Sequence, residues 1–131
     1  MLKQISPLRY EMTNINRFEL GKSTMHIIVW QFEVTRENIE EFKTIYGAEG
    51  EWAKLFSLGS GYLGTELLQS LDSNSRFITL DRWQSRDSFD GFKQQYAAAY
   101  AQLDARCDGL TLHEEKIGEY LRPDSLGSTH L

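Results

Sequence analysis

Hydrophobic and polar residues alternate in four stretches of this chain, which is the spacing of β-strands. These stretches are residues 26–34, 62–70, 76–83 and, with poorer alternation, 113–121. After the first and the third stretch, apolar residues recur at intervals of three and four, as on one side of a helix. The resulting order β-α-β-β-α-β predicts a ferredoxin-like α+β fold with a four-stranded antiparallel sheet and its helices on one face.

The first strand has two faces of different character. One face is wholly apolar and is made by Ile28, Trp30, Phe32 and Val34. We expect this face to lie under the helices. The other face is mixed and consists of Ile27, Val29, Gln31 and Glu33. If it stayed bare, it would expose apolar area to water, and such patches mark interfaces.

Helix boundaries follow from capping and stop residues. Thr35 is a suitable N-cap for a first helix that Gly47 ends, and a second short helix surrounds Trp52. Ser85 is expected to cap the longest helix, which ends between residues 108 and 112. Its apolar stripe is continuous and consists of Phe89, Phe92, Tyr96, Tyr100, Leu103 and Cys107.

The chain divides into three segments. Residues 1–24 are mostly polar, have no sustained period and read as an N-terminal extension. Residues 25–121 form the predicted domain, and residues 122–131 read as a flexible C-terminal tail. Met25 directly precedes the first strand, so whether translation starts there is left open.

Composition excludes several classes of partner. The 131 residues carry a formal net charge of −5, which argues against a nucleic-acid backbone or an anionic membrane surface as the partner. No apolar stretch approaches the roughly 20 residues of a membrane span. Cys107 is the single cysteine, so an intrachain disulfide is impossible. We therefore expect a cytoplasmic protein.

Few residues carry an obvious catalytic or metal-binding pattern. His26, His113 and His130 are far apart and lack ligand spacing, so we expect neither a metal site nor a cofactor. Cys107 lies on an apolar helix stripe, which favours a buried structural thiol. Adjacent carboxylates such as Glu114 point away from their neighbours, which is typical of solvated faces.

Polar residues on the bare sheet face are the stronger candidates. Gln31 is one, and Asp81 and Trp83 share its parity, whereas Arg82 has the opposite parity unless a bulge intervenes. Aromatic walls with a few polar groups are typical of small-molecule sites. A dimer interface would use the same residues, so both alternatives stay open.

Two short motifs carry a resemblance to a known family. Trp83-Gln-Ser-Arg-Asp-Ser-Phe89 resembles the W-x-S-x-x-x-F signature of the antibiotic biosynthesis monooxygenase superfamily, and Gly61-Tyr-Leu-Gly64 is similar to its G-[FY]-x-G stretch. The resemblance covers roughly residues 25–120. It implies a dimeric α+β barrel, in which the chain forms a homodimer through its sheet.

That superfamily includes cofactor-free oxygenases of polycyclic aromatic substrates and heme-degrading enzymes. In the heme degraders an Asn, a Trp and a His carry function, and these positions fall on Gln31, Phe92 and Gln102. All three residues depart from the pattern. An amide is a poor replacement for an axial imidazole, so we do not expect heme degradation.

The resemblance implies a cofactor-independent monooxygenase-like protein that acts on or binds a small aromatic or quinone-type molecule. We expect Gln31, Trp83 and Phe92 to line a cleft between helices and sheet, with Arg82 as the partner of a substrate anion. The alternative is a non-catalytic dimeric module that binds a ligand or a protein. An open, polar cleft would favour the enzyme, and a cleft filled by Trp and Phe side chains would favour the module.

Overall fold

Four antiparallel strands form one sheet in the order β2-β3-β1-β4. The computed structural model describes residues 25–123, so the predicted N-terminal extension and most of the predicted tail lie outside the described residues. The strands are β1 (His26–Val34), β2 (Tyr62–Gln69), β3 (Arg76–Trp83) and β4 (Thr111–Leu121). This topology confirms the predicted α+β, ferredoxin-like fold.

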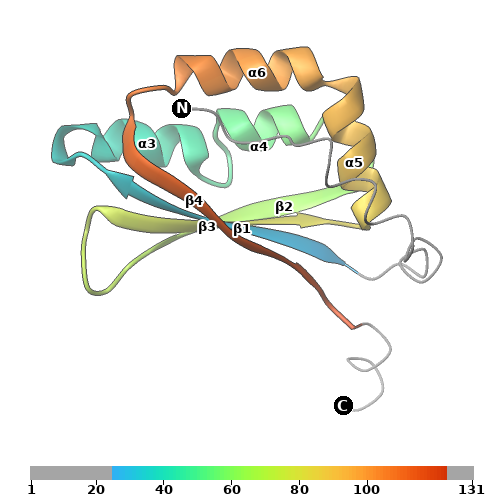
Figure 1. Cartoon of the computed structure of the whole chain (residues 1–131), viewed down its shortest axis with the longest axis horizontal. Coiled ribbons are helices and arrows are strands. Elements are labelled where there is room, and N and C mark those ends of the chain that lie inside the picture. Colours follow the sequence, from blue (N-terminus) through green and yellow to red (C-terminus); the bar gives the residue numbers. More distant parts are fainter. Residues whose placement is uncertain (1–24, 124–131) are drawn as a thin grey trace.

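The helices cover one face of the sheet and leave the other face bare (Figure 1). They are the 3₁₀ turn η2 (Arg36–Asn38), α3 (Ile39–Tyr46), α4 (Glu51–Phe56), α5 (Arg86–Gln95) and α6 (Ala97–Arg106). Helices α3, α4 and α6 lie along the sheet, and α5 descends toward it. The buried side chains of β1 and β3 on the covered face therefore lie between two layers.

Thr35 is the N-cap residue of the first helical turn, as predicted, but its side chain does not cap that turn. Thr35 precedes the 3₁₀ turn and its side chain makes no capping hydrogen bond, so the α-helix itself begins only at Ile39. The tighter turn is closed by the Asn38 amide, which donates to the Thr35 carbonyl at 2.9 Å. Gly47 follows the last helical residue, as predicted.

The predicted single long helix is wrong, because it breaks at Tyr96 into α5 and α6. Tyr96 has φ −112° and ψ 29°, outside the helical region. The break falls at neither Gly nor Pro. It redirects the apolar stripe, so that Phe92 packs against Trp83 while Tyr100 packs edge-on against Trp52, with ring centroids 4.9 Å apart.

The poor alternation of apolar and polar residues in β4 results from its irregular pairing with β1. Its pairing with β1 shifts register between Val29 and Trp30 and again between Glu33 and Val34. Each shift changes which parity faces the helices. A period of two is therefore lost in the sequence although the strand is continuous.

Aromatic side chains fill the space between helices and sheet. The apolar face predicted for β1 is buried as expected, and Phe32 is 0% exposed. Rings contact one another throughout the layer, for example Phe42 and Tyr46 with centroids 4.3 Å apart. The largest fully buried side chains include Trp52, Trp83, Tyr46, Phe32, Phe42, Phe77 and Phe92. These side chains occupy the space between helices and sheet in which the predicted cleft would lie.

The predicted parity of β3 is wrong. Gln31 lies opposite Ile78 in the antiparallel pairing of β1 with β3. The open face therefore carries Arg82, whereas Asp81 and Trp83 point toward the helices and are 5% and 0% exposed. A shift of one residue in the pairing register moves every side chain of a strand to the other face of the sheet. The alternation within one strand does not show which register is formed.

Candidate functional site

Both sequence motifs meet at one junction in the structure. The Gln84 amide donates to the Gly61 carbonyl at 2.7 Å, which ties the start of β2 to the end of β3. Gly61 has φ +93°, and a Cβ there would lie 2.4 Å from Ser88 Oγ. The Ser85 hydroxyl caps α5 by accepting from the Ser88 amide at 3.1 Å. The motif residues at this junction therefore hold the start of β2 against the end of β3 and the start of α5.

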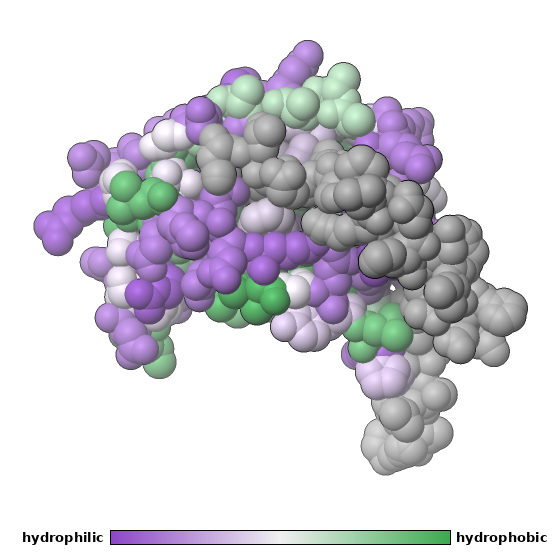
Figure 2. Space-filling view, viewed as in Figure 1, coloured by the Kyte–Doolittle hydropathy of each residue, from purple (hydrophilic) through white to green (hydrophobic). Residues whose placement is uncertain are grey.

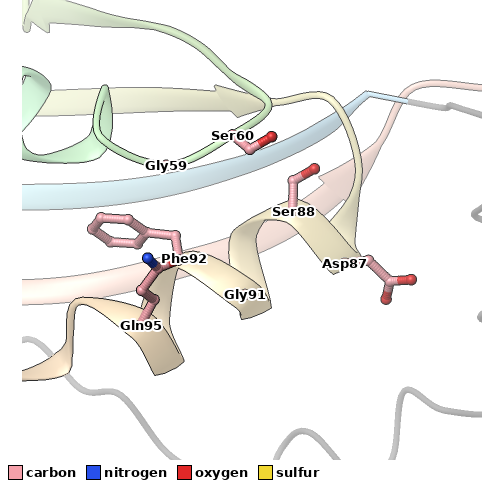
Figure 3. Close-up of a pocket in the computed structure, with 7 residues that line it drawn as sticks. All are labelled: Gly59, Ser60, Asp87, Ser88, Gly91, Phe92 and Gln95. Atoms are coloured by element: carbon pink, nitrogen blue, oxygen red, sulfur yellow. The ribbon is translucent and has the colours of Figure 1, made fainter.

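A hollow of about 330 Å³ opens beside this junction, and we call it the Phe92 hollow (Figure 3). It is lined by Gly59, Ser60, Asp87, Ser88, Gly91, Phe92 and Gln95. Ser60 comes from the loop before β2 and Ser88 from α5 on the other side. Asp87 points away from Phe92. This hollow offers an aromatic floor and neutral hydrogen-bonding groups, and its carboxylate is directed elsewhere.

A second hollow, of about 420 Å³, lies between α4 and β2, and we call it the Tyr62 hollow. It is lined by Ala48, Glu49, Ala53, Lys54, Ser57, Tyr62 and Gly64. The Tyr62 hydroxyl lies 2.6 Å from Thr65 Oγ1, which in turn donates to Asp81 Oδ1 at 2.7 Å. Burial raises the pKa of the Tyr62 phenol, and the charge of Asp81 raises it further. Sequence reasoning missed this chain of hydroxyls.

The two hollows share an aromatic wall. The Trp83 ring contacts both Tyr62 and Phe92, each with ring centroids 5.2 Å apart. Phe56 also contacts both rings, at 5.6 and 5.4 Å. Trp83 and Phe92 therefore contact each other, as packed core residues behind the two hollows.

Gln31 and Arg82 lie elsewhere, on the open face of the sheet. Gln31 borders a hollow of about 260 Å³ together with Leu68, Gln69, Ser70, Arg76 and Ile78. Arg82 pairs with Glu66, with Nη2 and Oε1 2.7 Å apart. The four predicted site residues thus divide between two faces and do not line one cleft.

The three positions that match the heme degraders do not converge either. Phe92 is 2% exposed within the core, and Gln31 is on the opposite face of the sheet. Gln102 lines a separate hollow between α4 and α6. Phe92, Gln102 and Gln31 thus each border a different hollow.

A cluster of charged side chains joins β1, β4 and α5. The Glu119 carboxylate lies 3.0 Å from His26 Nε2 and 3.3 Å from Arg86 Nη1, and it also accepts from Lys116. Burial alone would raise the pKa of Glu119, but the hydrogen bonds from His26 and Lys116 hold it well below its usual range. Its residues come from three elements that are distant in sequence, so no local sequence motif could have predicted the cluster.

The neighbouring pair Lys93 and Asp90 extends this cluster. Lys93 Nζ lies 3.7 Å from Asp90 Oδ1 and 4.2 Å from the centre of the Phe89 ring. Burial lowers the pKa of Lys93 to about 8 in spite of Asp90. Burial likewise raises the pKa of Asp90, against the nearby cations. Burial of this pair removes both charges from water, which costs free energy, and their mutual attraction offsets part of that cost.

Cys107 is buried, as predicted for a structural thiol. Within residues 25–123, no three His, Cys, Asp or Glu side chains gather in a group that could hold a metal ion. The helices of that part of the chain all lack the length and apolar character needed to cross a membrane.

Comparison with known proteins extends these observations. Residues 25–102 match the family model described as antibiotic biosynthesis monooxygenase. A search of curated proteins gave no match.

Solved structures share the fold at low sequence identity. SnoaB, a cofactor-independent oxygenase from Streptomyces nogalater, is 17% identical, with a TM-score of 0.58 over 75% of this chain and 92% of its own. PA3566 from Pseudomonas aeruginosa is 11% identical, with a TM-score of 0.54 over 76% of this chain and 94% of its own. These likenesses concern the fold.

Proposed function

This chain belongs to the antibiotic biosynthesis monooxygenase family, and we propose from this premise that it is a cofactor-independent monooxygenase for a small aromatic or quinone-type molecule. The observation that carries the proposal is the family match over residues 25–102. The oxygenase SnoaB, which shares the fold, supports it.

Such a reaction requires a substrate anion that can react with oxygen in surroundings that exclude water. The Phe92 hollow and the Tyr62 hollow are the two candidate places, because both border the aromatic wall formed by Trp83. Gln31 and Arg82 would contribute only through the open face of the sheet.

We also propose that the chain is a cytoplasmic homodimer joined through that open face. Figure 2 shows apolar side chains along the lower, helix-free side of the molecule. Leu68, Ile117 and Tyr120, on the two edge strands β2 and β4, are 44%, 43% and 50% exposed. An obligate interface should bury about 2,000 Å² or more. Sedimentation of a clean 15.2 kDa species at micromolar concentration would contradict the dimer.

Oxygen uptake tests the proposed reaction directly. The purified chain is mixed with a panel of anthrones and quinols without added metal or flavin, and oxygen is followed with an electrode. We expect uptake that is proportional to protein and unaffected by a chelator. Absence of uptake, together with an unchanged melting temperature for every compound, would refute the proposal.

A second function is favoured by one specific observation. Trp and Phe side chains fill the space between helices and sheet, which is the outcome expected of a non-catalytic module that binds a ligand or a protein. The two functions differ in one result. A ligand that raises the melting temperature but supports no oxygen uptake would identify the module.

A further inference from the structure

We infer that Tyr62, Thr65 and Asp81 form a proton-accepting relay for the hydroxyl group of an aromatic ligand bound in the Tyr62 hollow. The inference rests on the proposed function for its class of substrate. It adds the residues that would generate the substrate anion and the hollow in which this would occur.

The direction of the hydrogen bonds follows from the chemistry of the three groups. Thr65 donates its hydroxyl hydrogen to Asp81 Oδ1 at 2.7 Å. A hydroxyl has one hydrogen, so Thr65 must accept in its contact of 2.6 Å with the Tyr62 hydroxyl. Tyr62 is therefore the donor in that contact. Its oxygen keeps acceptor capacity for a hydroxyl group of a ligand.

The end of the relay is a buried carboxylate. Asp81 is 5% exposed on the covered face of the sheet, whereas Tyr62 is half-buried and lines the hollow. The three side chains thus connect a hollow that a ligand can enter to a carboxylate that the core buries. Charge-assisted hydrogen bonds to carboxylates are stronger than neutral ones, which holds the relay in this direction.

A bulge in β2 makes this arrangement possible. Residues three apart on a regular strand point to opposite faces. The pairing of β2 with β3 shifts register between Tyr62 and Gly64, so that Tyr62 lies opposite Trp83 and Thr65 opposite Asp81. Both Trp83 and Asp81 face the helices. Tyr62 and Thr65 therefore lie on the same face in spite of their odd spacing.

The hollow suits a neutral aromatic ligand. Its rim carries both Lys54 and Glu49, while Ala48 and Ala53 provide apolar surface. These opposite charges give no net attraction for a preformed anion. Lys54 can offset the negative charge once a bound ligand has ionised. A hydroxyaromatic molecule that enters neutral and loses its proton inside satisfies both conditions.

The proton transfer balances without any further reactant. The O–H bond of the ligand breaks as its proton passes to the Tyr62 oxygen. The original proton of Tyr62 moves to Thr65, and that of Thr65 moves to Asp81. One negative charge thereby moves from Asp81 to the ligand, and Tyr62 and Thr65 end as neutral hydroxyls. The Phe92 hollow lacks an equivalent, because its carboxylate, Asp87, points away (Figure 3).

The first test uses two probe ligands of similar size. Binding of 4-nitrophenol and of its methyl ether, 4-nitroanisole, is measured by calorimetry on the full chain, at a pH that keeps the phenol neutral. We expect the phenol to bind about 3- to 10-fold more tightly, the value of one net hydrogen bond. Tyr62→Phe should reduce this preference to about one while keeping the ring contacts.

Tyr96→Phe is the matched control, because the Tyr96 hydroxyl also makes one hydrogen bond, to the Leu58 carbonyl at 3.3 Å. It should leave the preference unchanged. In Thr65→Val, the Tyr62 hydroxyl loses its acceptor and can donate its hydrogen to the oxygen of either probe. This variant should therefore reduce the preference as Tyr62→Phe does. A preference that survives Tyr62→Phe, or equal binding of both probes by the unmodified chain, would overturn the inference.

A second test separates the relay from the proposed function. With any compound that supports oxygen uptake, Tyr62→Phe and Asp81→Asn should lower kcat at least 10-fold, as general-base losses do, and Tyr96→Phe should not. Uptake that persists in Tyr62→Phe overturns the relay and leaves the oxygenase. A Tyr62-dependent phenol preference without any uptake leaves the hydroxyl site and removes the oxygenase.

Discussion

Replacing Gly61 by Ala should destabilise the fold more than the same change at Gly64. Both glycines have positive φ, +93° and +138°, where an L side chain is strained. They differ in surroundings. A Cβ at Gly61 would meet Ser88 Oγ at 2.4 Å and Ser88 Cβ at 2.7 Å, whereas a Cβ at Gly64 meets nothing within 4 Å. Gly64→Ala is therefore the matched control for backbone strain alone.

The magnitudes follow from these two terms. A side chain in such a backbone conformation costs about 1–3 kcal/mol, which is the whole cost expected for Gly64→Ala. Forcing a methyl group against packed atoms costs about 1–3 kcal/mol more. Gly61→Ala should thus lower the free energy of unfolding by roughly 2–6 kcal/mol. The excess over Gly64→Ala measures the contact with Ser88.

The assay is urea unfolding at neutral pH with thermal melts beside it. A change of 1 kcal/mol shifts the melting temperature of a small domain by about 4–8 °C. Substitution of Ser88 identifies the source of the excess. In the Gly61→Ala background, Ser88→Gly should recover part of the loss, because it removes both contacting atoms. Ser88→Ala should recover less, because it keeps the Cβ that lies 2.7 Å away.

Equal losses for Gly61→Ala and Gly64→Ala would refute this reasoning. So would a double variant, Gly61→Ala with Ser88→Gly, whose loss is the plain sum of the two single losses. Additivity is expected only for residues that do not touch. Either result would mean that the start of β2 does not rest against α5 as the structure has it.

Three further predictions concern charge and heme. Glu119→Gln should lower stability by about 3 kcal/mol at pH 7, because it removes the carboxylate that pairs with His26, Arg86 and Lys116. The pKa of Glu119 is depressed in the folded state, so urea titrations should show the deficit shrinking as pH falls below 4.5. The pKa of Lys93 is about 8 when folded and 10.5 when unfolded, so the unfolded chain binds more protons and stability should rise between these values, a rise that Lys93→Met removes. Heme should give no one-to-one Soret shift and no loss of the band with ascorbate, because Gln102 and Phe92 border different cavities; a stoichiometric complex that releases iron would contradict this.

The sequence predicted the layers of this fold well because they depend on local patterns. Alternation placed the apolar face of β1 under the helices, and the Ser85 cap marked the start of α5 correctly. Packing between elements defeated the local patterns elsewhere. The apolar stripe is continuous through Tyr96 in the sequence, so it predicted one helix. The residues before and after Tyr96 pack against different partners, and the helix breaks there.

The candidate site was less accessible to sequence reasoning because it depends on register. Trp83 and Phe92 were found through aromatic content and motif position, and they do meet. Arg82 and Asp81 were assigned to the wrong faces, since pairing of β1 with β3 decides between two equally regular alternatives. Only the three-dimensional pairing puts a carboxylate behind Tyr62.

Gly64 connects the stability of this fold with its proposed chemistry. Its φ of +138° accompanies the register shift between Tyr62 and Gly64, and that shift brings Tyr62 and Thr65 to one face. A regular strand would turn one of these hydroxyls toward the open side and separate it from Asp81. Gly64→Ala should therefore weaken the preference for a phenol over its ether even in protein that remains folded. Gly91→Ala, at an exposed helical glycine with open space around it, should leave that preference intact while adding about 1 kcal/mol of stability.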